Sequence, residues 1–410
     1  MNKLAFFTSV LLVAFISLFF SCHKSNVAIS VEKELLFSLE YGNFEENINL
    51  FSLSNPGQVL TDISMKDGFY YISNGESKKV LELNSYGDLL SLYYNADFNP
   101  KPSFASENQT TQNQTSTRKA IPYQFNEARI VASDSRKYLY VVDLLPIERQ
   151  ELEEETKTLL SQIVLRFDNN GNFVDYIGQQ GPGGTPFPYI RNIHVSEDNE
   201  LVVVCQTNTG ITVYWFNEAG YLLYTIPFSI TALPNPLQDQ TDLETFVSLE
   251  NIIPSYSDRT LFVKLDYYTT TIDTATNVQS GIDYTTTLLY PLNVETGVYG
   301  QPLTIPPYED VVTDGFTKLV YPVSYDFLGV TNSGWLFFMV GDSTGYSILM
   351  IQADGYKIIK RHIDINHEDY LYHTFDLSAE GILSGLFAED NKVNVYRWRT
   401  DSLVDVIIQG

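Results

Sequence analysis

Cysteine, histidine and positive charge are scarce in this sequence. Its 410 residues include two cysteines and five histidines, and 25 Lys and Arg residues stand against 50 Asp and Glu residues. The net charge of −25 disfavours a nucleic-acid partner, because DNA and RNA are bound by Lys and Arg side chains that neutralise phosphates. We therefore expect the protein to bind no nucleic acid.

Local catalytic motifs are also missing. The sequence contains no nucleophile elbow, no phosphate-binding loop and no dinucleotide-binding fingerprint. This excludes the enzyme classes that are recognised by such motifs. It leaves open an active site assembled from distant loops, which would carry no local signature.

The N-terminus has the organisation of an export signal. Lys3 precedes an apolar stretch, residues 4–20, which ends at Ser21 and Cys22. The sequence LFFSC at 18–22 resembles a bacterial lipobox, and the resemblance implies that Cys22 is acylated and becomes the mature N-terminus. An uncleaved membrane anchor is the alternative, although the apolar stretch is at the lower limit of length for spanning.

This interpretation divides the chain into a signal peptide at 1–21, a tether at 22–33 and one folded domain at 34–410. It predicts export to a bacterial cell envelope, where acylated Cys22 holds the protein on membrane lipid and the domain faces the periplasm or the cell surface. Cys205, in the strand-like run VVVCQ, then has no disulfide partner and is expected to be a small core residue.

A repeated pattern accounts for the rest of the chain. Six segments alternate apolar and polar residues around a polar turn that usually contains glycine, which is typical of a β-hairpin. They are 81–89, 165–173, 214–222, 290–299, 349–357 and 396–404. Two further strand-like runs precede each hairpin. Six units of four antiparallel strands predict an all-β fold, a six-bladed β-propeller whose closed ring leaves few exposed edges.

One repeat carries a family resemblance. Residues 163–206, with a glycine- and proline-rich corner at 178–188, resemble the NHL-type propeller repeat. Together with the lipobox, they make the chain similar to six-bladed propeller lipoproteins of bacterial envelopes, a group with no common reaction. An extra hairpin, 34–41 and 47–54, is expected to pair beside the last blade and close the ring, and a seventh blade is the alternative.

Long connections interrupt the repeats at 95–127, 144–161, 227–243, 267–284 and 303–316. Because connections between antiparallel strands alternate between the faces of a ring, we expect all five on one face, where binding sites tend to form. The first, near 95–127, includes a polar tract with almost no apolar residues and is expected to be disordered. In the second, residues 147–160 place Arg149, Glu153 and Lys157 at i, i+4 spacing and predict a helix.

Polar residues end the second strand of each unit. They are Asn74, Asp143, Gln206, Asp266, Asp342 and Asp390. Side chains of this kind cap turns by bonding backbone amides two residues further on, and we expect that structural role. A ring of oxygen atoms that binds a cation is the alternative.

The link between the fifth and sixth units gathers three of the five histidines. His362, Asp364 and His367 are candidate metal ligands, because imidazole and carboxylate groups suit Zn²⁺. No helix fixes their spacing, and His373 falls on the following strand, so solvated loop residues are the competing interpretation. We expect no cofactor apart from such a bound divalent cation.

Four tyrosines in or beside the long connections are candidate anchors for a partner, since rigid aromatic side chains are enriched in binding hot spots. They are Tyr267, Tyr268, Tyr308 and Tyr370. The leading hypothesis is a lipid-anchored, non-enzymatic propeller that binds an envelope protein or a glycan. The alternative is a metal-dependent propeller hydrolase or lactonase that uses the histidine-rich link.

Overall fold

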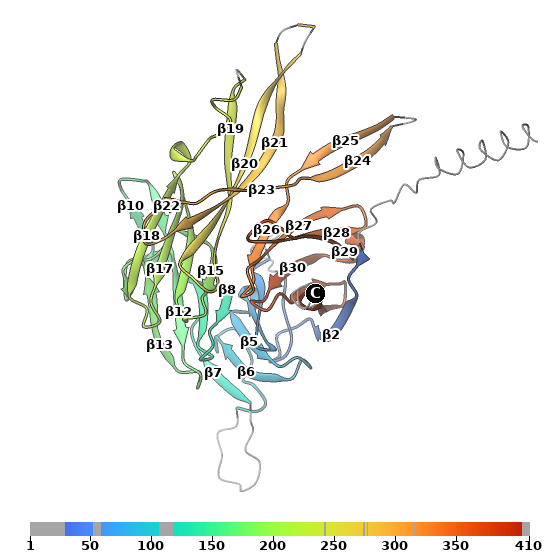
Figure 1. Ribbon diagram of the computed structural model, residues 1–410. Coiled ribbons are helices and arrows are strands. Elements are labelled where there is room, and N and C mark those ends of the chain that lie inside the picture. Colours follow the sequence, from blue (N-terminus) through green and yellow to red (C-terminus); the bar gives the residue numbers. More distant parts are fainter. Residues whose placement is uncertain are drawn as a thin grey trace, which may run out of the picture.

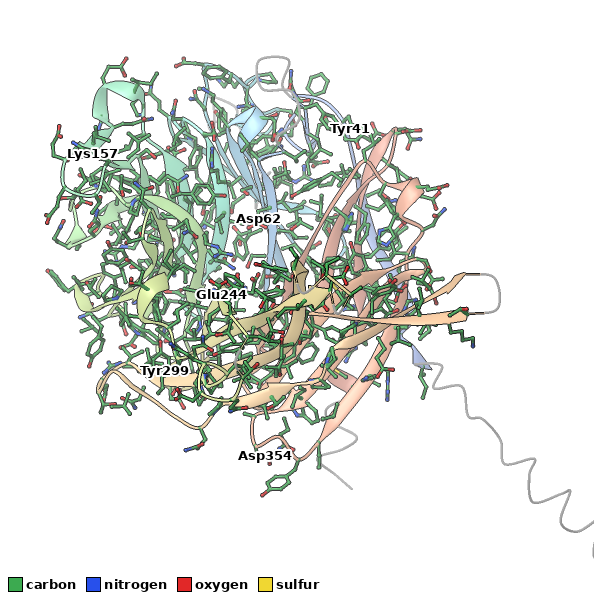
Figure 2. All side chains as sticks on the ribbon, turned by 90° about the horizontal axis from the view of Figure 1, so that it is seen from above. Tyr41, Asp62, Lys157, Glu244, Tyr299 and Asp354 are labelled. Atoms are coloured by element: carbon green, nitrogen blue, oxygen red, sulfur yellow. The ribbon has the colours of Figure 1, made fainter. Side chains whose placement is uncertain are left out.

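The computed structural model describes residues 29–51, 59–105, 118–241, 243–273, 275–276, 278–314 and 317–403. The predicted signal peptide, Cys22 and the polar tract at 106–117 lie outside these ranges. The described chain forms the six blades of an all-β propeller (Figure 1). Seen from above, the blades make a ring with Asp62 near its middle (Figure 2). The six-bladed prediction is confirmed, and the seven-bladed alternative is wrong.

The first half of the ring contains three blades. Blade 1 comprises β3 (Thr61–Lys66), β4 (Phe69–Asn74), β5 (Lys79–Leu83), β6 (Leu89–Tyr94) and β7 (Lys119–Pro122). Blade 2 comprises β8 (Ala128–Ser133), β9 (Leu139–Leu144), β12 (Gln162–Phe167), β13 (Phe173–Gly178) and β14 (Gly181–Pro182). Blade 3 comprises β15 (Tyr189–Val195), β16 (Leu201–Thr207), β17 (Gly210–Phe216) and β18 (Leu222–Ser229).

The second half contains the other three. Blade 4 comprises β19 (Thr245–Pro254), β20 (Thr260–Asp273), β21 (Val278–Asn293), β22 (Val298–Tyr299) and β23 (Leu303–Ile305). Blade 5 comprises β26 (Asp326–Val330), β27 (Trp335–Asp342), β28 (Gly345–Gln352), β29 (Ile358–Asp364) and β1 (Ile29–Ser30). Blade 6 comprises β30 (Tyr372–Leu377), β31 (Leu383–Ala388), β32 (Lys392–Trp398) and β2 (Lys33–Glu40).

Two hairpins of the described residues belong to no blade. They are β10 (Glu151–Glu153) with β11 (Thr158–Leu160), and β24 (Tyr308–Asp314) with β25 (Thr317–Val323). In the same described ranges, short 3-10 helices occupy four connections, namely η1 (Gly75–Ser77), η2 (Ile147–Arg149), η3 (Ile230–Ala232) and η4 (His367–Asp369). In the part of the chain that the structure describes, no helix has the length and apolar character needed to cross a membrane.

The N-terminal strand closes the ring. β2 pairs antiparallel with β32 as the outermost strand of blade 6, with Lys33 opposite Trp398 at one end and Glu40 opposite Lys392 at the other. β1 adds in parallel to β29 of blade 5. The N-terminal segment therefore pairs beside the last blade, as predicted.

Two details of the predicted closure are wrong. Only the first half of the predicted N-terminal hairpin is a strand, since residues 47–51 of the second half form no strand and make a single bridge, from Ile48 to Tyr41. Residues 401–403, which were expected to begin a fourth strand of the last unit, are helical. The place of that strand is taken by β2.

Six hydrophobic clusters fill the spaces between neighbouring blades. In one of them Phe37 and Leu39 of β2 pack with Ile63 of blade 1 and Val395 of blade 6. The other five repeat this arrangement around the ring, each drawing its residues from two adjacent blades. No blade can bury its faces without both neighbours, so the core is a closed ring of interfaces.

The glycine- and proline-rich corner leads the chain from blade 2 into blade 3. A Cβ atom on Gly178 would lie 2.3 Å from the Gly184 carbonyl oxygen, so the two arms of the corner approach too closely for any other residue at this position. The Gln179 amide donates to the Thr185 carbonyl at 2.8 Å. Phe187 follows, fully buried, and anchors the entry to β15.

The predicted helix at 147–160 is wrong. The segment forms η2 and the β10–β11 hairpin, with Lys157 at φ 56° in its turn. Thr158 and Leu160 are buried at the edge of blade 2, whereas a helix would have exposed the segment on all sides. Burial against the blade therefore overrides the i, i+4 charge pattern.

The first long connection crosses from one face of the ring to the other, because Lys119 returns beside Ser91 in the first half of β6. The other four lie on one face, as the strand order predicted. We call it the loop face: it holds the turns between second and third strands and the links between blades. The predicted loop at 267–284 is wrong in detail, because β20 and β21 continue through most of it. These two strands and the β24–β25 hairpin project beyond the ring (Figure 1). The opposite turn face carries short turns such as 84–88 and 217–221.

We predict that ring closure depends on the buried residues of β2. Leu39 is 4% exposed and Leu35 is 50% exposed on the same strand. Leu39→Ala should lower the free energy of unfolding by about 2–5 kcal/mol through the cavity it leaves. The matched control Leu35→Ala should change it by less than about 0.5 kcal/mol. Urea unfolding followed by tryptophan fluorescence measures both, and equal effects would show that β2 does not seal the core.

Candidate functional site

The six inner strands enclose a central channel. β3, β8, β15, β19, β26 and β30 line a cavity of about 210 Å³. Side chains of β3 alternate, so that Ile63 and Met65 enter the core while Asp62, Ser64 and Lys66 line the channel. The side chains that the first blade points into the channel are therefore polar.

A hydrogen bond crosses the channel near the turn face. Lys66 Nζ of blade 1 donates to the Tyr256 hydroxyl at 2.9 Å, and Tyr256 follows the inner strand of blade 4, on the opposite side of the ring. The Lys66 ammonium also lies 5.1 Å from the centre of the Tyr256 ring. This cross-link narrows the channel at the turn face, so that access is easier from the loop face.

Two carboxyl groups that line the channel have strongly raised pKa values. Burial raises the pKa of Asp62 and the pKa of Asp376 from 3.8 to about 7 each. Asp376 Oδ2 accepts a hydrogen bond from the Met65 amide at 2.8 Å, which fastens blade 6 to blade 1. His194 of blade 3 also lines the channel; burial lowers its pKa to about 4, and its Nε2 is buried without a hydrogen-bond partner in the described chain.

Four of the inner strands contain a β-bulge. The register shifts in β8, β15, β19 and β26. In β15 the extra residue is Arg191, whose guanidinium donates to the Glu250 carbonyl at 2.9 Å, and Glu250 is itself the extra residue of β19. Bulges redirect side chains at the rims of closed sheets. They place charged groups of neighbouring blades together at the loop-face mouth of the channel.

A second and larger cavity lies beside blade 5. It has a volume of about 930 Å³, and we call it the blade 5 groove. Its lining residues come from β1, the β24–β25 hairpin and the outer strands of blade 5: Ile29, Ser30, Tyr308, Glu309, Tyr325, Thr344, Ser347, Ile348, Lys360, Arg361, His362 and Asp364. The groove thus joins the N-terminal strand to a hairpin outside the blades.

The groove brings together three residues that the sequence analysis selected. His362 Nδ1 lies 3.4 Å from Asp342 Oδ2, and His362 Nε2 lies 3.4 Å from Asp364 Oδ1. Tyr308 forms the opposite wall. Its pKa is raised by burial. Tyr308, His362 and Asp364 therefore belong to one site, although they were proposed for two different roles.

The third candidate metal ligand points elsewhere. His367 Nε2 lies 3.2 Å from each of the Asp342 and Gly345 carbonyl oxygens. No group of three or more His, Cys, Asp or Glu side chains in the described residues is arranged to hold a metal ion. A zinc site on His362, Asp364 and His367 stays a prediction, and it would require His367 to leave both carbonyls.

The predicted turn-cap role holds for one residue of the six. Asp342 Oδ1 accepts from the Thr344 amide at 2.9 Å, two residues on, as expected. Asp143 instead accepts from the Asn126 and Glu127 amides of the preceding link, and Asn74 bonds both backbone groups of Asn49.

The other three side chains do not bond an amide two residues on. Gln206 donates to the Gly210 carbonyl at 2.8 Å. Asp266 forms a buried ion pair with Lys264 at 2.8 Å, while Asp390 is exposed at the end of its strand. The capping prediction is wrong for Gln206 and Asp266, because their partners are set by packing between strands.

The candidate partner-binding tyrosines differ in exposure. Tyr267 is fully buried and donates its hydroxyl to the Pro234 carbonyl at 2.7 Å, so its assignment to partner binding is wrong. Tyr268 is half-buried and makes an edge contact with Tyr284. Tyr370 accepts from Lys33 Nζ at 3.4 Å and packs on Phe387. These partners belong to the fold itself.

Sequence reasoning missed the channel carboxyls and the basic pair of the groove. The signal for Asp62 was present, since a charged residue at alternate positions of the run LTDISMK marks a strand face that is not core. Lys360 and Arg361 were passed over as flanking residues of the histidine-rich link. Their placement in a groove depends on β24, which lies about 50 residues earlier in the chain.

Comparisons with known proteins concern the fold. A comparison with models of protein families finds no match, and a comparison with curated proteins finds no similar sequence. Solved structures that this one resembles include the polysaccharide lyase Uly1, at 8% identity over 90% of this chain and 99% of that chain, with a TM-score of 0.41.

Two other solved structures are similarly distant. A gluconolactonase from Xanthomonas campestris has 12% identity over 90% of this chain and 97% of that chain, with a TM-score of 0.37. The β-propeller domain of the Trilobed protease from Pyrococcus furiosus has 11% identity over 88% and 96%, with a TM-score of 0.37. Nothing about the chemistry of this protein follows from likenesses this distant.

We predict that Asp62 makes folding less favourable as pH rises. With a pKa of about 7 in the fold and 3.8 as its ordinary value, Asp62 stays protonated in the folded chain while it ionises in the unfolded chain. Stability is therefore lost between pH 4 and pH 7 and is constant above that range. Asp62→Asn should gain stability relative to the parent over this interval.

The measurement is thermal unfolding of parent and variant at half-unit steps from pH 4 to pH 8. The exposed Asp97 serves as a matched control, because Asp97→Asn removes a carboxyl that faces solvent. A difference between parent and Asp62→Asn that is the same at pH 4 and pH 8 would contradict the raised pKa.

Proposed function

We propose that this protein is an exported, lipid-anchored binding module of a bacterial cell envelope, and that it docks a protein partner on its loop face. The observation that carries the proposal is the pair of hairpins that project beyond the ring, one formed by β20 and β21 and the other by β24 and β25 (Figure 1). The lipobox at 18–22 and the NHL-type repeat at 163–206 support the anchored propeller.

Apolar side chains cover one face of the β24–β25 hairpin. Val312 lies opposite Leu319 and Asp310 lies opposite Tyr321, so these residues share a face with Val323. Leu319, Tyr321 and Val323 are exposed, as is every residue of β25. An isolated two-stranded sheet is marginally stable in water, and exposed apolar edges invite pairing. A partner that covers this face would stabilise the two-stranded sheet and would bury its exposed apolar side chains.

The tip of the other hairpin has the same character. Ile272 and Ile282 are exposed where β20 and β21 extend past β19 as two strands. Phe246, Tyr268 and Tyr284 line up across the three strands below the tip. Apolar side chains on projecting strands are typical of protein-binding surfaces.

A protein fits this surface better than a lipid bilayer does. Glu309 and Asp310 lie on the same hairpin, and the whole chain carries a net charge of −25, which disfavours contact with anionic headgroups. A protein partner can supply apolar side chains together with backbone groups for the free strand edges.

Glutamate substitutions on the loop face and on the turn face test where the partner docks. Leu319→Glu with Tyr321→Glu should lower recovery of the partner from detergent-solubilised envelope at least tenfold. The matched control Tyr221→Glu with Tyr356→Glu alters exposed tyrosines of the turn face and should leave recovery unchanged. Equal melting temperatures establish that both variants fold. Loss of the partner only in the turn-face variant would place docking on the wrong face and overturn the proposal.

Anchoring is tested at Cys22, which lies outside the described residues. Cys22→Ala should abolish incorporation of radiolabelled palmitate into the protein, whereas Cys205→Ala should not, because the Cys205 thiol is buried in blade 3. Membrane fractionation should then find the Cys22→Ala protein released from the membrane. Undiminished labelling of this variant would overturn the lipid anchor.

A further inference from the structure

The blade 5 groove is built as a ligand site at the base of the β24–β25 hairpin, where Tyr308, opposite Val323 in register, forms one wall. Its volume of about 930 Å³ is within the range of pockets that hold small ligands or a few sugar rings. Its lining combines hydroxyl groups, two tyrosines, one histidine and charged groups of both signs. Such a mixture is suited to a ligand that is rich in hydroxyl groups.

The wall of the groove next to blade 5 is held by hydrogen bonds. Asp342 accepts from Thr344 Oγ1 at 2.8 Å and from Ser347 Oγ at 2.9 Å. His362 Nε2 lies 3.2 Å from Thr344 Oγ1, and Ser30 of β1 donates to Asp364. These donors and acceptors are therefore oriented before a ligand arrives, which reduces the entropy cost of binding.

The opposite wall is aromatic. Tyr308 and Tyr325 contact each other edge to face, with ring centres 6.1 Å apart and an angle of 86° between the rings. Tyr325 is buried beneath, whereas Tyr308 is only partly buried and faces the groove from the base of the hairpin. The Tyr308 ring can pack against the apolar face of a sugar ring.

One cation lies on the same face of β29 as the histidine. Lys360, His362 and Asp364 occupy alternate positions of the strand, and Lys360 lies opposite Leu349, which belongs to the same cluster as Tyr325 and Tyr308. Arg361 also borders the groove, but its side chain belongs to the other face of the strand, because its register partner Ile348 packs between blades 5 and 6. The exposed Lys360 ammonium is therefore the group that can pair with a ligand carboxylate.

The overall charge limits how acidic the ligand can be. The chain carries −25, and Glu309 and Asp364 also line the groove, so a densely charged polyanion would be repelled. A sugar chain with one carboxylate per ring keeps its charges apart. The two carboxylates of the groove can then accept hydrogen bonds from its hydroxyl groups.

We propose that the blade 5 groove binds an acidic saccharide of the uronate type, with one ring against Tyr308, its hydroxyl groups on Thr344, Ser347 and Asp364, and its carboxylate on Lys360. This site does not depend on the docking of a protein partner, because the residues that carry it differ from Leu319 and Tyr321. With this site, the protein binds an acidic saccharide in addition to a protein partner.

The test uses hexasaccharides of galacturonate, mannuronate and glucuronate in titration calorimetry, each beside its carboxyl-reduced neutral counterpart. At least one uronate should bind, and its reduced form should bind at least tenfold more weakly. A heparin hexasaccharide serves as the densely sulfated comparison and should bind more weakly than the best uronate. Absence of binding by all three uronates, equal binding of the reduced forms, or preference for heparin would overturn the proposal.

Variants place the ligand in the groove. Tyr308→Ala should weaken binding of the best uronate at least tenfold, and Lys360→Gln, at an exposed position, should weaken it about threefold without risk to folding. Arg361→Gln, on the opposite face of the same strand, should bind like the parent. Arg149→Gln and Tyr356→Ala, exposed on other blades, are the matched controls and should bind like the parent. Unchanged affinity in Lys360→Gln and Tyr308→Ala would overturn the site.

Discussion

Closure of the ring by β2 is the constraint on which the rest of this structure depends. Each of the six core clusters lies between two blades, so blades 1 and 6 each keep an exposed face until they meet. The pairing of β2 with β32 supplies the final strand of blade 6, and Phe37 and Leu39 complete the cluster with blade 1. The cross-channel bond of Lys66 and the bond from Met65 to Asp376 then act within a ring that is already closed.

The fold was predictable because its signals are local. Alternation of apolar residues and glycine at the hairpin turns are properties of short windows, and they identified six units. The segment 147–160 shows where this stops: its charge spacing suits a helix, yet β9 and β12 leave blade 2 side by side and carry the connection as a hairpin. Thr158 and Leu160 are buried against that blade, which no window of the sequence reveals.

The candidate site was predictable only in part, because a propeller assembles its cavities from distant strands. His362 and Asp364 were selected as possible ligands and Tyr308 as a possible anchor, and the groove unites them. Tyr267 failed as an anchor because neighbouring positions on a strand face opposite sides, and it is the one that points into the core. The choice between adjacent tyrosines needed the register of blade 4.

The position of β2 also fixes when the protein can fold. Residues 33–40 are synthesised long before residues 392–398, so β2 has to wait for its partner until nearly all of the propeller has been made. Contacts of such long sequence separation form slowly, and blades assembled earlier expose unpaired edges meanwhile. The ring reaches its lasting form only after a strand from the beginning of the domain has met one from its end.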